Sequence, residues 1–202
     1  MSERLRWLER ALIGIGAALA VWSALTVAEA DFFSTLPPPR HGTIARLPGE
    51  DAANAASTST ATSRAGLRAG DWVARLEIPR IDLSATVLEG SDDATLGRAA
   101  GHIEDTALPG APGNAGIAAH RDTIFRPVRN LRIGDVMTVT TADGVYDYRV
   151  DRTMIVNPED VYVLDPTGHP TLTLVTCYPF TFIGHAPKRF IAQASLVAKR
   201  PR

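Results

Sequence analysis

The stretch Thr171–Phe180, TLTLVTCYPF, contains the only cysteine of the chain and decides the fold class. Its first six residues are β-branched or aliphatic, which favours a strand over a helix. Pro179 cannot donate a hydrogen bond to a strand ladder, so the strand is expected to end just past Cys177. Because side chains alternate along a strand, Cys177 and Thr176 are predicted to point to opposite faces.

A thiol at the end of a strand can be held rigidly and still face a cleft, which suits a nucleophile. Free cysteines are more commonly small buried hydrophobes, and they become reactive only in electropositive, partly exposed surroundings. With a single cysteine, the chain cannot form an internal disulfide. Cys177 is therefore either buried or a reactive free thiol, and the residues around it must decide between the two.

The N-terminal region carries the signals of a membrane anchor. Residues 11–28 form an uncharged run of 18 residues, and three arginines lie within residues 1–10. A run of this length is near the lower limit for crossing a bilayer, and the charge bias predicts a cytoplasmic N-terminus (1–10) and an exported body. A cleaved signal peptide is the alternative, since Ala28-Glu29-Ala30 resembles a cleavage site. The length of the run favours a retained transmembrane signal-anchor over 11–28.

Residues 29–68 are predicted to be a flexible linker. Pro37-Pro38-Pro39 should form a short extended spacer, and residues 49–66 are rich in Ala, Ser, Thr and Asn, with few large apolar groups. The remaining residues 69–202 are enough for a single core without disulfides. A net charge of −1 gives no reason to expect nucleic-acid binding.

From Trp72 onward, short apolar or alternating runs are separated by turn residues. The dipeptide Asp143-Gly144 is a strong hairpin signal between two of them. One short helix is expected over residues 92–98. Seven or eight short strands at this spacing predict an all-β closed barrel or sandwich. The predicted strands cover residues 73–78, 85–88, 117–120, 136–141, 145–155, 171–177 and 190–197.

Acyl chemistry at a thiol needs a group that moves protons and a group that stabilises an oxyanion. Of the five histidines, His120 is the candidate, because it ends a small-residue strand just as Cys177 does. The others lie in the linker, in turns or at the end of a possible helix, where solvated or structural roles are expected: His41, His102, His169 and His185.

Arg189 is the candidate for binding a carbonyl or an oxyanion, because its guanidinium is planar and permanently charged. The alternative is that it forms a solvated surface pair with Lys188. No phosphate-binding loop or paired-cysteine metal site is present, so no cofactor is expected. The sequence leaves calcium dependence open, because its acidic residues are scattered without the spacing of a dedicated calcium site: Glu104, Asp105, Glu159 and Asp160.

The segment Thr171–Ala194, TLTLVTCYPFTFIGHAPKRFIAQA, resembles the cysteine strand, following loop and arginine strand of sortases. Its Cys-Tyr-Pro-Phe and Ala-Pro-Lys-Arg-Phe pieces look most like class D members. The segment Gly101–Thr123 resembles the histidine region of the same family, with Ala118-Ala119 where Ala-Gly is expected before the histidine. The resemblance covers roughly residues 72–198, in the family's order of His, Cys and Arg.

The resemblance implies a closed sortase-type β-barrel of about eight strands with short helices, preceded by the transmembrane helix and linker. It also implies a membrane-anchored cysteine transpeptidase that cleaves an LPxTG-like sorting signal through a thioacyl enzyme. Cys177 would be the nucleophile, His120 the acid and then the base, and Arg189 the group that holds the substrate backbone and the oxyanion. The Thr176 hydroxyl or a nearby backbone N–H would assist, and the loop Val156–Pro170 would select the substrate.

The implied partners are surface proteins that bear a sorting signal, and an amine acceptor on a cell-wall precursor or another protein. The implied location is the bacterial cell membrane, with a single span and the catalytic domain on the extracytoplasmic side. Two alternatives stay open. An exported thiol hydrolase or peptidase would use the same three residues, whereas a non-catalytic exported binding module would need Cys177 buried and unreactive.

Overall fold

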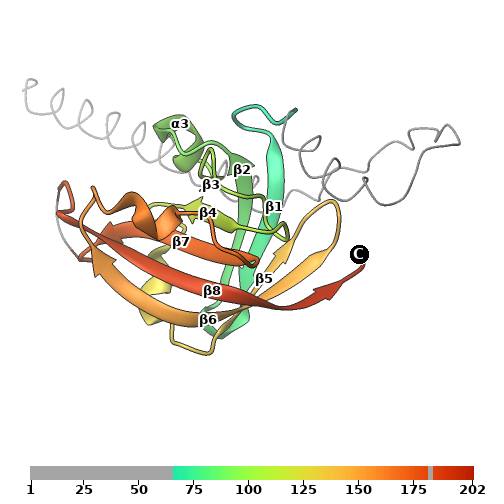
Figure 1. The fold of residues 1–202 in the computed structure, drawn as a ribbon. Coiled ribbons are helices and arrows are strands. Elements are labelled where there is room, and N and C mark those ends of the chain that lie inside the picture. The colour runs from blue at the N-terminus through green and yellow to red at the C-terminus, as the bar shows by residue number, and fades with distance from the viewer. Residues whose placement is uncertain (1–65, 182–183) are drawn as a thin grey trace, which may run out of the picture.

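The computed structural model describes residues 66–181 and 184–202 (Figure 1). The predicted anchor over 11–28 and nearly all of the predicted linker over 29–68 lie outside this part of the chain. Among the described residues, no helix is both long and apolar enough to cross a membrane. The transmembrane helix therefore stays a prediction.

The described residues form a closed barrel of eight strands, which confirms the predicted all-β fold. Around the barrel the order is β1-β2-β3-β4-β7-β8-β6-β5, and β5 pairs back onto β1. Closure leaves no open sheet edge. The strands are β1 (Trp72–Ile78), β2 (Leu83–Glu89), β3 (Ala100–His102), β4 (Asn114–Ala118), β5 (Val136–Thr140), β6 (Val145–Val156), β7 (Thr171–Tyr178) and β8 (Lys188–Arg200).

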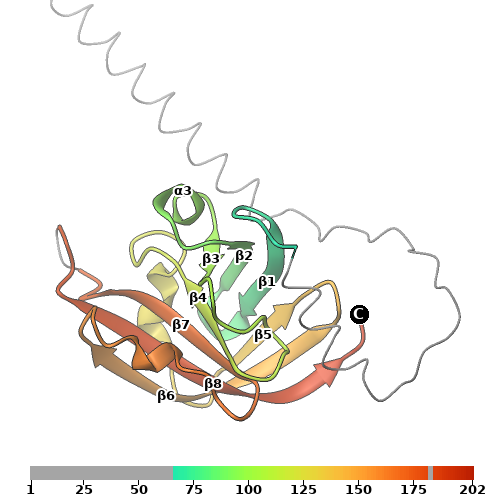
Figure 2. The same ribbon diagram turned by 45° about the horizontal axis from the view of Figure 1, so that its top comes forward.

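Short helices occupy four of the connections in the described part: η1 (Pro79–Ile81), α3 (Asp93–Leu96), η2 (Arg126–Asn130) and η3 (Val161–Leu164). The predicted helix over 92–98 corresponds to α3. It starts where the Asp92 carboxylate accepts hydrogen bonds from the N–H groups of Ala94 and Thr95, at 2.9 and 3.1 Å. In both views α3 lies beside β2 and β3, away from β6 and β8 (Figures 1 and 2).

Strand β3 was missed by the sequence analysis, which placed His102 at the end of a helix. Residues Ala100–His102 instead pair parallel with β2 and antiparallel with β4. The small residues of this strand give no β-propensity signal in the sequence. Gly101 allows the backbones of β3 and Gly90 to approach closely, since a Cβ on Gly101 would lie 2.1 Å from the Gly90 carbonyl oxygen. The expected structural role of His102 is seen: its buried ring lies 2.7 Å (Nδ1) from the Glu89 carboxylate and 3.0 Å (Nε2) from the Ala107 carbonyl oxygen.

Two apolar clusters pack on opposite faces of the sheet. Inside the barrel, Leu172 and Leu174 of β7 join the main core, as the alternation in the sequence predicts. On the outside, Val163 of η3 packs with Val156 and Ile191, and the partly buried Val175 lies against this smaller cluster. The connection that contains η3 is therefore seated on the outer face of β6, β7 and β8.

Replacing Gly101 by Ala should lower the free energy of unfolding by about 1–3 kcal/mol, because the added methyl group meets backbone that cannot rotate away. Gly168→Ala is the matched control, since no atom lies within 4 Å of its Cβ position. Urea unfolding of both variants measures the difference. Equal stability of the two would show that β3 does not approach Gly90 as described.

The ion pair between Arg80 and Asp135 joins the β1–β2 turn to the start of β5. Its hydrogen bond from Arg80 lowers the pKa of Asp135 below the ordinary value of 3.8. The unfolded chain then binds this proton at a higher pH than the folded one, so the stabilisation is complete above about pH 5 and is lost as the pH falls through the folded pKa. Asp135→Asn should therefore lose less stability than the parent between pH 5 and pH 2.5. Urea unfolding curves across this range that fall in parallel for the two proteins would contradict the assignment.

Candidate active site

Strand β7 holds Cys177 at the centre of the candidate site. In the barrel β7 lies between β4 and β8, as Figure 1 shows. Cys177 is the last residue but one of β7, and its thiol is partly exposed. The alternative of a non-catalytic module required a buried thiol, and this position does not fit it.

Arg189 lies directly across from Cys177 in the antiparallel pair of β7 and β8. Directly opposed residues of two strands project from the same face of the sheet, with Cβ atoms about 4.5–5.5 Å apart. The Arg189 side chain therefore begins beside that of Cys177. Its Nη1 donates to the carbonyl oxygens of Ala186 and Lys188, at 3.2 and 3.0 Å. Within the described residues, Nε and Nη2 have no hydrogen-bond partner. The neighbouring Lys188 side chain donates to Asn157 instead.

His120 comes beside Cys177 through the parallel pair of β4 and β7. The last pair of this ladder is Ala118 with Val175, and the Ala119 N–H continues it with a bond of 3.3 Å to the Val175 carbonyl. His120 follows Ala118 by two residues, as Cys177 follows Val175, so the chain beyond the end of β4 brings His120 alongside Cys177. The predicted strand over 117–120 ends earlier than expected, at Ala118. In the part of the chain described, no hydrogen bond joins the half-buried imidazole to the thiol, which is common in enzymes without substrate.

The Thr176 hydroxyl does not occupy the oxyanion-supporting position that the sequence analysis gave it. Thr176 faces the barrel interior, is 3% exposed and donates to the Ala119 carbonyl oxygen at 2.7 Å. Cys177, the next residue, faces the opposite side, because side chains alternate along a strand. In this structure the hydroxyl fixes the main chain immediately before His120.

The predicted substrate loop, Val156–Pro170, is fixed to the barrel by buried amides. Asn114 of β4 donates to the carbonyl oxygens of Val163 and Asp165, at 2.9 and 3.2 Å. Gln193 of β8 also donates to the Val163 carbonyl, at 2.7 Å, and the Thr173 hydroxyl donates to the Asn114 amide oxygen at 2.7 Å. Neither amide was singled out from the sequence, because their partners are main-chain carbonyls far away in the chain.

The same loop presents apolar side chains to solvent. Val161 is 67% exposed and Tyr162 59%, although both belong to the short helix whose Val163 is buried. Ile155, at the end of β6, is 51% exposed. Because η3 packs on the face of β7 that carries Val175, Val161 and Tyr162 offer an apolar surface on the side to which alternation along β7 also assigns Cys177.

The scattered acidic residues do not come together as metal ligands. In the ranges 66–181 and 184–202, no group of three or more His, Cys, Asp or Glu side chains could hold an ion. Glu104 has a structural partner, since it accepts hydrogen bonds from the Ser91 N–H and hydroxyl at 3.0 and 2.6 Å. The hydroxyl bond lowers the pKa of Glu104. Independence from a cofactor stays a prediction.

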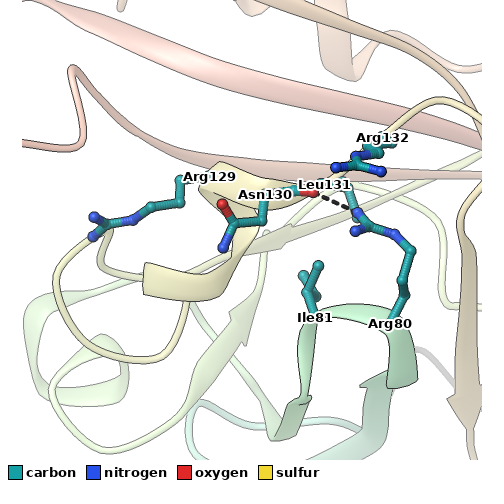
Figure 3. Close-up of a pocket in the computed structure, with 6 residues that line it drawn as sticks. All are labelled: Arg80, Ile81, Arg129, Asn130, Leu131 and Arg132. Atoms are coloured by element: carbon teal, nitrogen blue, oxygen red, sulfur yellow. Dashed lines mark hydrogen bonds between the residues drawn. The ribbon is translucent and has the colours of Figure 1, made fainter.

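A hollow of about 430 Å³ opens between η1 and η2, and none of the three candidate residues lines it (Figure 3). The guanidinium of Arg80 is bound there by Asp135 and by the Asn130 carbonyl oxygen. Arg129 points away from Arg80 in Figure 3, and its guanidinium carbon lies 5.9 Å from the ring centroid of Phe180. Arg129 therefore does not converge with Arg80, and the Arg80 guanidinium already has partners, so we do not assign a ligand to this hollow. Its lining residues are Arg80, Ile81, Arg129, Asn130, Leu131 and Arg132.

Comparison with known proteins decides the family. Residues 76–197 match the Sortase domain family, and the chain is 33% identical over 150 residues to Sortase D of Bacillus subtilis, covering 73% of this chain and 76% of that protein. The chain belongs to the sortase family. It is also 30% identical over 128 residues to Sortase A of Listeria monocytogenes, covering 61% of this chain and 56% of that protein.

A solved structure agrees with this family. The Sortase D5 transpeptidase of Clostridium perfringens superposes with a TM-score of 0.61 at 29% identity, covering 70% of this chain and 89% of that one. The resemblance to class D sortases is therefore confirmed, and the chain is a sortase-type cysteine transpeptidase. Sortases act on surface proteins that bear a sorting signal.

Replacing Thr176 by Val should destabilise this sortase by about 1–3 kcal/mol, because the buried Ala119 carbonyl loses its donor. Thr176→Ser keeps the hydroxyl and is the matched control. Melting temperature and transfer rate should be measured together. Unchanged stability with a loss of rate of about 100-fold would instead place the hydroxyl at the oxyanion.

Proposed function

We propose that this sortase cleaves a sorting signal of the LPxTG type and transfers the acyl part to an amine, using Cys177, His120 and Arg189. The observation that supports the proposal is the register of β4, β7 and β8, which opposes Arg189 to Cys177 and pairs the chain just before His120 with the cysteine strand. A partly exposed thiol, an imidazole and a permanent cation on adjacent strands are the groups that acyl transfer requires.

In the first half-reaction, the Cys177 thiolate attacks the carbonyl carbon of the scissile peptide bond. Arg189 donates to the oxygen that becomes negative, through the guanidinium nitrogens left without a partner in the described structure. His120 enters as the imidazolium and gives its proton to the leaving amine as the C–N bond breaks. The products are a thioester on Cys177, a free amine and a neutral imidazole.

In the second half-reaction, an acceptor amine attacks the thioester carbonyl. Neutral His120 takes the proton of the incoming amine, and the C–S bond breaks to return the thiolate. The new peptide bond replaces the old one, so the cycle consumes no net proton. The exposed Val161 and Tyr162 give the apolar residues of the sorting signal a surface beside the thiol.

We further propose that the protein works at the outer face of the bacterial membrane. The support is the uncharged run over residues 11–28 with its preceding arginines, which lies outside the described residues. The acceptor amine would then belong to a cell-wall precursor or to another surface protein.

Product analysis tests the transfer itself. Purified protein should be incubated with a fluorogenic peptide containing Leu-Pro-Ala-Thr-Gly, with and without triglycine as the amine. The proposal predicts that the Thr-linked triglycine product dominates once the amine is present. A product that is always the free acid would favour the thiol hydrolase, and an uncleaved peptide would contradict the proposed substrate.

Arg189→Lys should reduce the transfer rate by about 100-fold or more, because an ammonium retains the charge but loses the planar pair of donors. Lys188→Ala is the matched control on the neighbouring residue, whose side chain reaches Asn157, and it should remain within a few-fold of the parent. Melting temperatures should accompany both rates. A nearly silent Arg189→Lys beside an inactive Lys188→Ala would show that the two residues had been assigned the wrong way round.

A further inference from the structure

Arg121, the residue after His120, binds the loop that follows Cys177. It is only 9% exposed, although it carries a permanent charge. Its Nη1 donates to the Pro179 carbonyl oxygen and its Nη2 to the Gly184 carbonyl oxygen, both at 3.0 Å. One guanidinium thus joins residues 120–130, which we call the histidine segment, to two points of the connection between β7 and β8.

The contact of Arg121 holds the chain next to His120, which the strand ladder does not reach. Arg189 is held opposite Cys177 by paired strands, whereas β4 ends at Ala118, two residues before His120. The Thr176 hydroxyl fixes the Ala119 carbonyl on one side of His120. Arg121 fixes the other side, so the histidine is bracketed by contacts to residues on both sides of Cys177.

A second arginine of the same segment reinforces this link. The guanidinium of Arg129 in η2 lies over the ring of Phe180, which also packs against Tyr178 and Phe190 at centroid distances of 5.9 and 5.3 Å. Phe180, in the connection that follows Cys177, is therefore packed against Arg129 of the segment that begins with His120. Only Arg121, however, is adjacent to the histidine.

We propose that Arg121 is a positioning residue that sets the distance between the Cys177 thiol and the His120 imidazole. The inference rests on the proposed function, in which His120 protonates the leaving amine. Proton transfer requires the two groups within hydrogen-bond reach of the substrate, and a displacement of about 1 Å can cost about 100-fold in rate. Two hydrogen bonds from a planar guanidinium fix both distance and orientation, which a single ammonium cannot.

The leaving group of the substrate separates positioning from a merely structural role. An amide substrate needs a proton from His120 to expel its amine, whereas a thioester with the same acyl sequence expels a thiolate without one. A variant that displaces His120 from Cys177 should therefore lose amide cleavage and retain thioester cleavage. A variant that only weakens the fold or the binding of the acyl part should lose both to the same extent.

The experiment compares Arg121→Ala and Arg121→Lys with Arg126→Ala, a matched control because Arg126 is an exposed arginine of the same segment. Each protein is given a Leu-Pro-Ala-Thr-Gly peptide and the corresponding Leu-Pro-Ala-Thr phenyl thioester, below its melting temperature. We expect Arg121→Ala to lose about 30- to 100-fold in kcat on the amide. The rate of thiophenolate release in a single turnover of the thioester, which comes before the step in which His120 acts as a base, should change by less than about 3-fold. The KM of the amide should stay within about 3-fold of the parent. Arg121→Lys should show the same selectivity with a smaller loss, and Arg126→Ala should match the parent on both substrates.

Equal losses on amide and thioester, or an amide rate within about 3-fold of the parent in Arg121→Ala, would overturn the proposal. If Arg121→Ala does not fold, the ratio of the two rates in Arg121→Lys decides in the same way. A parent protein that acylates with neither substrate would refute the proposed function rather than this inference.

Amide hydrogen exchange provides a readout that needs no substrate. The proposal requires faster exchange in residues 119–125 of the variants, and unchanged exchange there would contradict it.

Discussion

The pairing of β7 with β4 on one side and β8 on the other is the constraint on which this site depends. The parallel ladder of β4 and β7 ends at the pair Ala118 and Val175. The antiparallel ladder of β7 and β8 places Arg189 opposite Cys177. Three strands that are separate in the sequence therefore lie side by side. Adjacent strands lie about 4.8 Å apart, so residues that are in register lie close together. This proximity comes from the backbone pairing and needs no direct contact between the side chains. The barrel supplies rigidity, because closure leaves each of these strands paired on both sides.

Polar contacts outside the ladders complete the arrangement. Thr176 binds the main-chain carbonyl just before His120, and Arg121 binds two carbonyls of the β7–β8 connection. Asn114 and Gln193 bind the Val163 carbonyl of η3. Each of these side chains is buried, and leaving such a group or its carbonyl partner without a hydrogen bond costs about 1–3 kcal/mol. Loss of any one of these contacts is therefore expected to affect both stability and the geometry of the loops around Cys177.

The sequence predicted the elements whose residues have a strong local preference. The β-branched run of β7, the alternating β8 and the hairpin at Asp143-Gly144 all form as expected, and the family resemblance led to the barrel. It failed at β3, because Ala100–His102 has no strand propensity and pairs only through the close approach of Gly101. It also misplaced the Thr176 hydroxyl, because the hydroxyl's partner is a main-chain carbonyl 57 residues away, which leaves no trace in the local pattern.

The most direct test of the account is the intact mass of the protein during turnover of a Leu-Pro-Ala-Thr-Gly peptide without added amine. The account predicts a mass increase equal to the acyl part, mapped by proteolysis to the peptide that contains Cys177 and removed by hydroxylamine or triglycine. The adduct should be absent from Cys177→Ala, which should keep the parent's melting temperature, since the partly exposed thiol contributes little to the core. Product formation by Cys177→Ala, or an adduct on any other residue, would contradict the central claim that Cys177 is the nucleophile.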